Sequence, residues 1–210
     1  MAESVKDGSR SARARSTRRR IIDAAAALFV DQGYGKTTLE QVAERAGVAV
    51  QTVYFHFGNK RTVLKEALDV AAVGDDDEPV ALLDRPWFDR VQDEPDPRRV
   101  ISLWTENSRT IVERVGPILG VVRDAAVVDA DMATQWDTNE RQRLVAFRTL
   151  AQLLADRDAL KPDMSVADAT DITFMLLGPE TYLLLTTRRN WTPAKWQRWV
   201  TATLTSALLR

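Results

Sequence analysis

Gly33 and Gly47 divide the amino-terminal third of the chain into short helical segments, and this spacing restricts the fold more than any other feature. Residues 17–32 place apolar side chains on one helical face, and Gly33 follows as a helix stop. The next segment, "TLEQVAERAG", repeats apolar residues at helical spacing and ends at Gly47. Thr38 and Gln41 stand three residues apart at its start, which is the pattern of a capping box.

A third and a fourth helix are predicted beyond the second glycine. The third is a short helix over residues 49–56 with Val53 facing inward. Asn59 can cap a fourth helix that begins at Lys60. Two short helices joined by a glycine turn, with another helix before them, form a helix-turn-helix unit. We therefore predict a helix-turn-helix domain over residues 17–73.

The rest of the chain is predicted to be helical as well. No alternating strand pattern or Asn-Gly hairpin signal competes with the helical spacing of its apolar residues. Proline and glycine breaks predict helices over residues 80–92, 97–114, 117–128, 130–158, 165–188 and 193–209. Pro179 should kink or restart its helix, because proline lacks a backbone N–H. The predicted fold class is all-α, with a larger helical domain over residues 74–210.

Charge is distributed unevenly along the chain. Residues 1–70 hold 12 Lys and Arg against 8 Asp and Glu, a net charge of +4, whereas the remainder holds 17 against 22, a net charge of −5. A basic third joined to an acidic remainder suggests a segment that binds a polyanion. Residues 1–16 are polar and arginine-rich without an apolar period, which predicts a flexible basic arm. Its arginines, with Arg18, Arg19 and Arg20, either enter a minor groove or only raise the local charge.

Composition excludes several classes of protein. The chain has no cysteine, which rules out disulfides, thiolate metal sites and cysteine nucleophiles. The only histidine, His56, has no tight carboxylate cluster beside it, so no metal, cofactor or catalytic site is predicted. No run approaches the roughly 18 apolar residues of a membrane span. The stretch "AAAALFV" is too short for a signal peptide and lacks a cleavage site. The sequence indicates a cytoplasmic protein that is not an enzyme.

The first residues of the short helix at 49–56 suit the base edges of DNA. A helix can enter the major groove, which is about 12 Å wide. The amide of Gln51 can pair with adenine through two hydrogen bonds. Val50 or the methyl group of Thr52 can contact a thymine methyl. This helix is therefore predicted to read base sequence.

Tyr54 and His56 follow on the same helix, at a spacing that lets their polar tips reach phosphates. Val53, Phe55 and Phe57 already supply apolar bulk, which favours a phosphate contact for Tyr54 over a packing role. A structural role is the alternative for His56. Both residues are predicted to contact the DNA backbone.

Helix starts on either side supply further phosphate contacts. Lys60 stands at the start of the fourth helix, where its charge adds to the backbone amides and the helix dipole. Thr37 and Thr38 place hydroxyls at the start of the second helix. The alternative for Lys60 is a solvated surface lysine.

The stretch "AAAALFVDQGYGKTTLEQVAERAGVAVQTVYFHFGNKRTVL" resembles the DNA-binding domain of the tetracycline-repressor (TetR) family of bacterial regulators. The resemblance covers residues 17–68, about a quarter of the chain. The stretch "LLGPETYLLLTTRRNWTPAKWQRWVTATLTSALL" is also similar to the carboxy-terminal helices of many members. The resemblance implies an all-helical homodimer with a recognition helix and an effector pocket in the larger domain. It implies phosphate contacts from Thr38, Tyr54, His56 and Lys60.

Two residues depart from the family pattern. Many members have Ser or Thr in place of Ala49, so this recognition helix lacks a side-chain cap worth about 1 kcal/mol. Many have Gly in place of Gln51, so no operator sequence can be carried over from the family.

The larger domain contains aromatic and polar side chains suited to a small-molecule site, which combines an apolar cavity with a few polar groups. The candidates are Trp104, Asn107, Ser108, Ile111, Met132, Trp136, Phe147, Phe174 and Met175. Asp137, Glu140 and Arg123 are candidates for recognising a charged effector. Aromatic residues at helical spacing also form ordinary core, which is the alternative for this set.

Apolar residues near the carboxy terminus have two interpretations, a dimer interface and an intrachain core. In the TetR family, helices of this region build a four-helix interface between two protomers. The resemblance carries that role to Leu177, Leu184, Leu185, Trp196, Trp199, Leu204 and Leu208.

These features predict a sequence-specific regulator that binds double-stranded DNA. The resemblance implies that it is a repressor and that a small-molecule effector releases it from the DNA. In a homodimer, two recognition helices about 34 Å apart would match one DNA turn, which predicts a near-palindromic operator. The alternative is an architectural or protein-partner module that binds DNA with little sequence preference. In a specific regulator, by contrast, each base-pair change costs about 1–3 kcal/mol of affinity.

Overall fold

The computed structural model of the chain describes residues 2–73, 83 and 85–210, with side chains from residue 12 onward except at residue 73. Its helices are α1 (Ala2–Lys36), α2 (Leu39–Ala46), α3 (Val50–Phe57), α4 (Lys60–Val73), α5 (Pro86–Asp93), α6 (Pro97–Ala126), α7 (Ala130–Asp156), α8 (Val166–Leu177), α9 (Pro179–Leu183), the π-helical turn η2 (Leu184–Arg188) and α10 (Pro193–Leu208). In this part of the chain, β-pairing is limited to one isolated bridge, between Leu160 and Leu209. The all-α prediction is confirmed.

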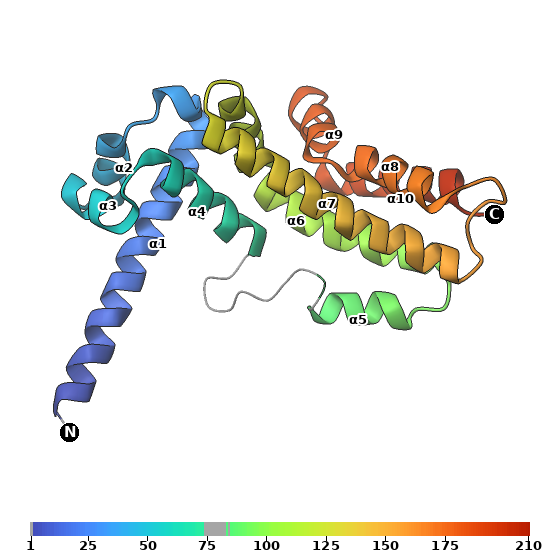
Figure 1. Ribbon diagram of the computed structural model, residues 1–210, viewed down its shortest axis with the longest axis horizontal. Coiled ribbons are helices and arrows are strands. Elements are labelled where there is room, and N and C mark those ends of the chain that lie inside the picture. The colour runs from blue at the N-terminus through green and yellow to red at the C-terminus, as the bar shows by residue number, and fades with distance from the viewer. Residues whose placement is uncertain (1, 74–82, 84) are drawn as a thin grey trace.

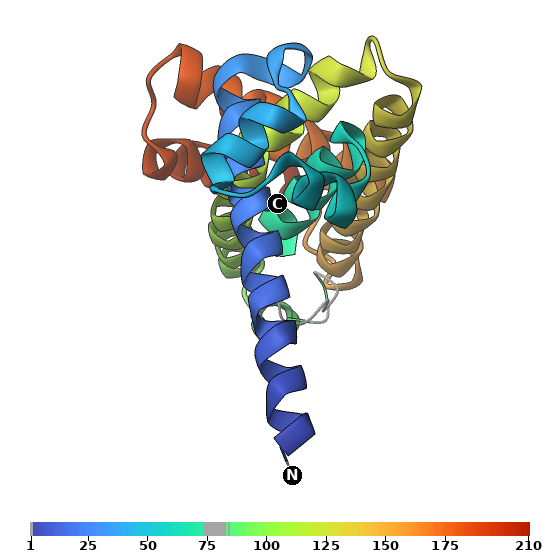
Figure 2. The same ribbon diagram turned by 90° about the vertical axis from the view of Figure 1, so that its left-hand side faces the viewer.

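The helices form two groups (Figure 1). Helices α1 to α4, called the head below, gather at one end, and α5 to α10 form the body. Helices α6 and α7 lie side by side along the body, and α6 also packs on α1 and α4 (Figures 1 and 2). The amino-terminal half of α1 projects beyond the rest of the head (Figure 2). Among the described helices, none is both long and apolar enough to cross a membrane.

Local signals end and start the head helices where the sequence predicts. Gly33 has a φ of 82° and interrupts the helical geometry of α1. Thr38 and Gln41 form the predicted capping box at the start of α2. Gly47 ends α2 in the left-handed conformation, with a φ of 64°. Residues with a Cβ rarely adopt this conformation. Asn59 caps α4 by accepting a 3.0 Å hydrogen bond from the backbone N–H of Thr62.

The helix predicted over residues 49–56 is α3, displaced by one residue. Ala49 occupies its N-cap position and makes no side-chain capping bond, as expected from the departure noted above. The helix is therefore held mainly by the burial of Val53 and Phe57 and not by its own cap.

Three predicted boundaries are wrong. Helix α6 continues through Pro117, where a break was expected, and packs there on α7 and α9. The single helix expected over residues 165–188 is divided into α8, α9 and η2, since Gly178 is extended and Pro179 starts a new helix. Residues 2–16, expected to form a flexible arm, continue α1 without a break. Residues 2–16 contain no proline, the residue that most strongly interrupts a helix, so α1 can continue through them.

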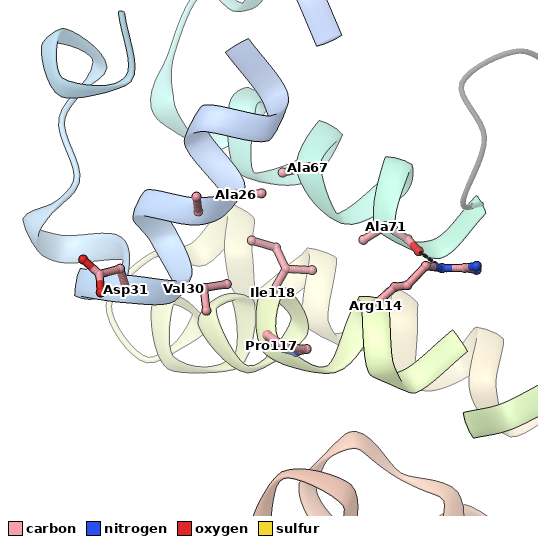
Figure 3. Close-up of a pocket in the computed structure, with 9 residues that line it drawn as sticks. Ala26, Val30, Asp31, Ala67, Ala71, Arg114, Pro117 and Ile118 are labelled. Atoms are coloured by element: carbon pink, nitrogen blue, oxygen red, sulfur yellow. Dashed lines mark hydrogen bonds between the residues drawn. The ribbon is translucent and has the colours of Figure 1, made fainter. Parts of the chain in front are cut away.

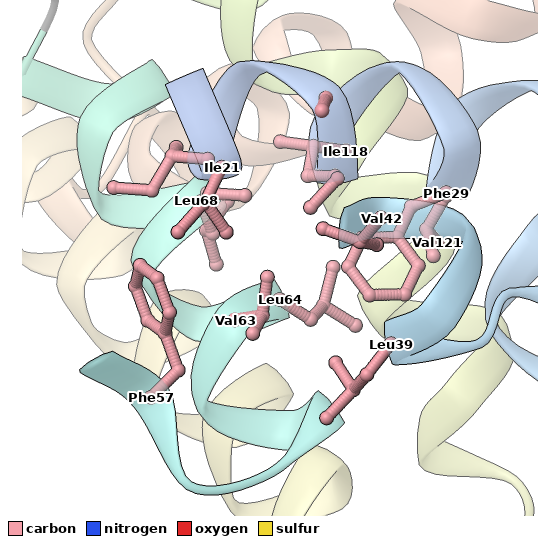
Figure 4. Close-up of a cluster of buried hydrophobic side chains, with 14 of the residues drawn as sticks. Ile21, Phe29, Leu39, Val42, Phe57, Val63, Leu64, Leu68, Ile118 and Val121 are labelled. Carbon is pink, nitrogen blue, oxygen red and sulfur yellow. The ribbon is translucent and has the colours of Figure 1, made fainter. Parts of the chain in front are cut away.

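The core is divided into two clusters that do not follow the division into head and body. The first joins α1 to α4 and includes Ile21, Phe29 and Leu64 (Figure 4). Ile118 and Val121 of α6 belong to it as well. The head therefore shares its core with the end of α6, and a domain boundary at residue 73 does not separate the packing.

The second cluster fills the body between α5, the first half of α6, α7, α8, α9 and α10. Its fully buried side chains include Trp196, Ile101 and Leu150. Helix α6 contributes side chains to both clusters, so a displacement of this helix would disturb the packing of both.

Candidate nucleic-acid interface

Helix α3 has one buried face and one exposed face. Val53 and Phe57 point into the first cluster, with exposed fractions of 0 and 5%. Gln51 and Tyr54 are exposed on the other face. A short helix that is anchored on its apolar side and open on its polar side can enter a major groove.

Phe55 differs from its expected packing role, because 85% of its surface is exposed. Val53 and Phe57 are four residues apart and share the buried face, so a residue midway between them must point away. Its ring meets that of His56 edge-on, with 5.4 Å between centroids. The spacing of Val53 and Phe57 in the sequence already indicated that Phe55 is exposed. Phe55 is therefore a candidate DNA contact that the sequence analysis missed.

Thr38 and Thr37 are neighbours with opposite environments. Thr38 is exposed, and its hydroxyl accepts from the backbone N–H of Gln41 at 3.3 Å. Thr37 is 1% exposed, and its hydroxyl donates to the Gly33 carbonyl at 2.9 Å and accepts from the Gln32 amide at 3.3 Å. The prediction that Thr37 contacts DNA is wrong, because its hydroxyl completes the end of α1 inside the head.

Val50, Thr52 and His56 are half-buried on α3. Val50 packs against the first cluster, so only part of its side chain remains accessible. Their DNA contacts stay predictions.

Lys60 lies at the start of α4 but is already engaged. Its ammonium donates to the backbone carbonyl of Tyr34 at 2.8 Å and lies 4.2 Å from the centre of the Tyr34 ring. Burial lowers the pKa of Lys60, and the nearby charge of Asp129 opposes that effect. An ammonium has three N–H donors, so one bond to Tyr34 leaves donors for a phosphate.

Two arginines at the end of the basic segment bind within the head. Arg20 donates to the carbonyl of Ala46 at 2.6 Å, which satisfies the end of α2. Arg18 pairs with Glu66 and lies 5.6 Å from the centre of the Phe57 ring. These contacts give Arg18 and Arg20 a structural role.

The nine residues predicted to line an effector pocket are spread over the body. Trp104 is 2% exposed and meets Trp87 and Phe88 edge-on, so it is core. Met132 is 3% exposed and belongs to the first cluster. Met175 is 61% exposed. The pocket prediction is wrong for Met132, which packs on the head, and for Met175, which lies on the surface.

Trp136, Phe147 and Phe174 do lie together, around Arg143. The Arg143 guanidinium is 5.3 Å from the centre of the Trp136 ring and 5.0 Å from that of Phe174. Phe147 meets Phe174 edge-on, with 6.1 Å between centroids. Asn107, Ser108 and Ile111 are half-buried on α6.

Arg143 is the polar residue of this group that the sequence analysis missed. Burial lowers its pKa, whereas Glu180, 3.6 Å from one guanidinium nitrogen, acts in the opposite direction. Among the described residues, none of its three guanidinium nitrogens has a hydrogen-bond partner. A buried donor without an acceptor is costly unless a ring face or a ligand satisfies it.

A hollow of about 510 Å³ lies elsewhere, between the head and α6 (Figure 3). Its walls include Val30 of α1, Ala67 of α4 and Ile118 of α6. Asp31 and Arg114 are the charged residues of its lining, and they have opposite signs. None of the nine predicted pocket residues lines this hollow.

Most of the predicted dimer residues are inside the protomer. Trp196, Leu204 and Leu208 are 0% exposed, and Leu177 is 4% exposed. The interface prediction is wrong for these four, because the second cluster already covers their side chains. Of the other three, Leu184 is 55% exposed, and Leu185 and Trp199 are half-buried.

In the described part of the chain, no three His, Asp or Glu side chains gather in a group that could hold a metal ion. The candidate site consists of the exposed helix α3 with basic and hydroxyl groups around it, carried by a helical body.

The family model of the bacterial regulatory proteins, tetR family, matches residues 21–67, which span α3 and its supporting helices. Residues 21–67 therefore form a DNA-binding domain of the TetR type.

Relatives share this domain at high identity. The uncharacterized HTH-type transcriptional regulator TtgW of Pseudomonas putida is 50% identical over 58 residues, which are 28% of this chain and 43% of TtgW. The HTH-type transcriptional regulator SrpR of Pseudomonas putida is also 50% identical over 58 residues, 28% of this chain and 27% of SrpR. The chain therefore matches less than half the length of these curated relatives.

Solved structures match the chain in fold over nearly its whole length. NalD, the secondary repressor of the MexAB-OprM multidrug efflux pump in Pseudomonas aeruginosa, gives a TM-score of 0.67 at 23% identity, over 93% of this chain and 98% of NalD. FadR from Bacillus subtilis, in complex with stearoyl-CoA, gives a TM-score of 0.70 at 15% identity, over 90% of this chain and 97% of FadR. At these identities the likeness establishes the fold.

Proposed function

We propose that this chain is a sequence-specific transcriptional repressor that a small-molecule effector releases from its operator. The observation that carries the proposal is the exposed polar face of α3 on a family-matched domain. The family is one of regulatory proteins, which agrees with the expectation that the chain is not an enzyme. A protein that binds bacterial DNA works in the cytoplasm, so the proposal implies that location.

In the proposed complex, α3 enters the major groove with Gln51 toward the bases. Tyr54 and Phe55 project from the same exposed face, where a phenol suits a phosphate and an apolar ring suits a thymine methyl. Thr38 and Lys60 contact phosphates on either side.

The proposed effector site lies in the body around Trp136, Phe147 and Phe174. These rings supply an apolar wall, and the guanidinium of Arg143, which also faces Glu180, supplies one polar group. FadR, a relative in fold alone, was solved with stearoyl-CoA, which supports a ligand-holding role for such a body. Effector binding releases DNA only if the effector prefers a state with lower operator affinity.

The proposal includes a homodimer formed through the carboxy-terminal helices. Leu184 and Met175 are exposed apolar side chains there, with Leu185 and Trp199 partly exposed beside them. Two heads related by a two-fold axis require an operator with inverted half-sites.

The test is selection of bound DNA from a random pool at about 150 mM salt, where nonspecific phosphate binding is weakened. An enriched inverted repeat supports a dimeric, sequence-specific regulator. Binding without enrichment, which collapses as salt rises, would instead support the architectural alternative.

The effector part has its own experiment. Small molecules are screened for those that raise the melting temperature of the chain, and each is then added to the chain bound to its selected DNA. We expect a stabilising ligand to lower DNA affinity. A saturating ligand that stabilises the chain and leaves the affinity unchanged would contradict release by that ligand.

A further inference from the structure

Asp129 joins the body to the head at the turn between α6 and α7. Its carboxylate accepts from the Tyr34 hydroxyl at 3.1 Å and from Nε of Arg61 at 2.7 Å. It also caps α7 by accepting from the backbone N–H groups of Asp131 and Met132, at 3.1 and 3.4 Å. Only 9% of the side chain is exposed. One carboxylate thus holds the end of α1, the start of α4 and the start of α7.

The head side of this contact leads to Lys60. The backbone carbonyl of Tyr34 accepts from the Lys60 ammonium at 2.8 Å, and the Tyr34 ring lies beneath that ammonium. Arg61, the other partner of Asp129, follows Lys60 directly in α4. The charge of Asp129 also raises the pKa of Lys60 against the effect of burial. Asp129 therefore acts on Lys60 through both geometry and charge.

The residues around Asp129 differ in how they meet the head. Val127 and Val128 before it are 84 and 82% exposed. Met132 after it is buried in the first cluster, as is Val122 near the end of α6. A displacement of the end of α6 would therefore reach the bonds of Asp129 as well as this packing, and charge-assisted hydrogen bonds depend steeply on distance and angle.

We propose that Asp129 is a positioning residue for DNA binding: through Tyr34 and Arg61 it fixes Lys60 for a phosphate, and it transmits movement of the α6–α7 turn to that lysine. The inference rests on the proposed function, since it assigns Lys60 to a DNA phosphate. It adds a residue of the body, remote in sequence from the helix-turn-helix, to the determinants of DNA affinity.

The experiment is a double-mutant cycle of Asp129→Asn and Lys60→Gln. Asparagine has nearly the shape of aspartate and is an equally good helix N-cap, so α7 keeps its start. Binding is measured by fluorescence anisotropy on a random-sequence duplex at low salt, where phosphate contacts dominate. We expect each single substitution to weaken binding about fivefold, and the double substitution to be no weaker than Lys60→Gln alone, because coupled residues are not additive.

Asp131→Asn is the matched control. Asp131 is 70% exposed and also pairs with Arg61, at 3.2 Å, whereas the Tyr34 hydroxyl donates to Asp129. Removing its negative charge near DNA should leave binding unchanged or slightly tighter. Loss of a negative charge alone would not weaken DNA binding, so the weakening expected for Asp129→Asn must come from the lost positioning of Lys60.

Two results would overturn the inference: Asp129→Asn binding the duplex as tightly as the unchanged chain, or the two substitutions weakening binding additively. Circular dichroism and thermal melting show whether each variant is folded. Tyr34→Phe, which keeps the ring and removes only the bond to Asp129, replaces Asp129→Asn in the cycle if the latter unfolds. Failure of the unchanged chain to bind any duplex would overturn the proposed function itself, which separates the two failures.

Discussion

The head and the body are both helical, yet different forces determine where their helices end. In the head, Thr38, Gly47 and Asn59 each end or start a helix through bonds to backbone groups within a few residues. In the body, α6 runs through Pro117 because its neighbours hold it, although an internal proline is costly for a helix. The comparison teaches that short-range bonds make the head's boundaries readable from sequence, whereas packing between distant helices decides those of the body.

The largest expected effect tests whether the carboxy-terminal tryptophans are core. Trp196 is 0% exposed and meets Tyr182 edge-on with 5.1 Å between ring centroids. Trp196→Ala should lower the free energy of unfolding by about 3–5 kcal/mol, because it leaves a large cavity. Urea unfolding followed by circular dichroism measures the loss.

Trp199→Ala is the matched control, since Trp199 is only half-buried three residues further along α10. It should cost clearly less stability than Trp196→Ala. If Trp196→Ala instead dissociates a dimer while each protomer stays fully stable, Trp196 belongs to the interface and our division of the body is wrong.

The next effect concerns base reading by the head. Gln51→Ala removes the exposed amide of α3 and should cost about 1–3 kcal/mol of discrimination at one base pair of each half-site. Competition binding with single base-pair substitutions measures this discrimination. An unchanged preference at every position would show that Gln51 faces no base.

Thr37 and Thr38 offer a sharper contrast inside the head. Thr37→Val should lower the free energy of unfolding by about 1–2 kcal/mol, because the Gly33 carbonyl loses its buried donor. Base preference should stay the same, because Thr37 is 1% exposed. Thermal melting and DNA competition are measured on the same samples. A changed base preference with unchanged stability would show that Thr37 contacts DNA after all.

A smaller effect is expected at the turn between α2 and α3. Gly47 has a φ of 64°, so Gly47→Ala should cost about 1 kcal/mol of stability through backbone strain. Gly35 is helical and has open space where a Cβ would stand, so Gly35→Ala should be neutral or slightly stabilising. Equal effects of the two substitutions in urea unfolding would show that local geometry does not fix this turn.

The smallest effect is a pH dependence at the junction of head and body. The hydrogen bond from Arg61 holds the pKa of Asp129 below its usual value. A depressed pKa stabilises the fold above the unfolded value of about 3.9, and the stabilisation is lost as pH falls through the folded pKa. Asp129→Asn should therefore lose less melting temperature on acidification below about pH 4 than the unchanged chain. A parallel decline in both would contradict this role.

The sequence was sufficient for the helix-turn-helix because its caps and glycines act locally. It also identified Gln51 and Tyr54 as exposed, since their spacing from Val53 places them off the buried face. It did not predict that Thr37 is buried, because the hydroxyl of Thr37 donates to the carbonyl of Gly33, where the helical geometry of α1 is interrupted.

The body was less readable from sequence. Trp196 and Trp199 are both apolar residues at helical spacing, and only the packing of α10 on α6 and α8, with the Tyr182 ring against Trp196, shows that the first is core. Arg143 was missed because its aromatic neighbours come from α7 and α8, so no local pattern marks it. Asp129 was missed for the same reason, since Tyr34 and Arg61 lie far from it in sequence.

The most direct test of the account is DNA selection from a random pool, run in parallel on the unchanged chain and on Gln51→Ala. We expect an inverted repeat for the unchanged chain. For the variant, we expect the same repeat with relaxed preference at one symmetric position of each half-site. No enriched repeat, or an identical motif from both proteins, would contradict the claim that α3 reads DNA through its exposed face.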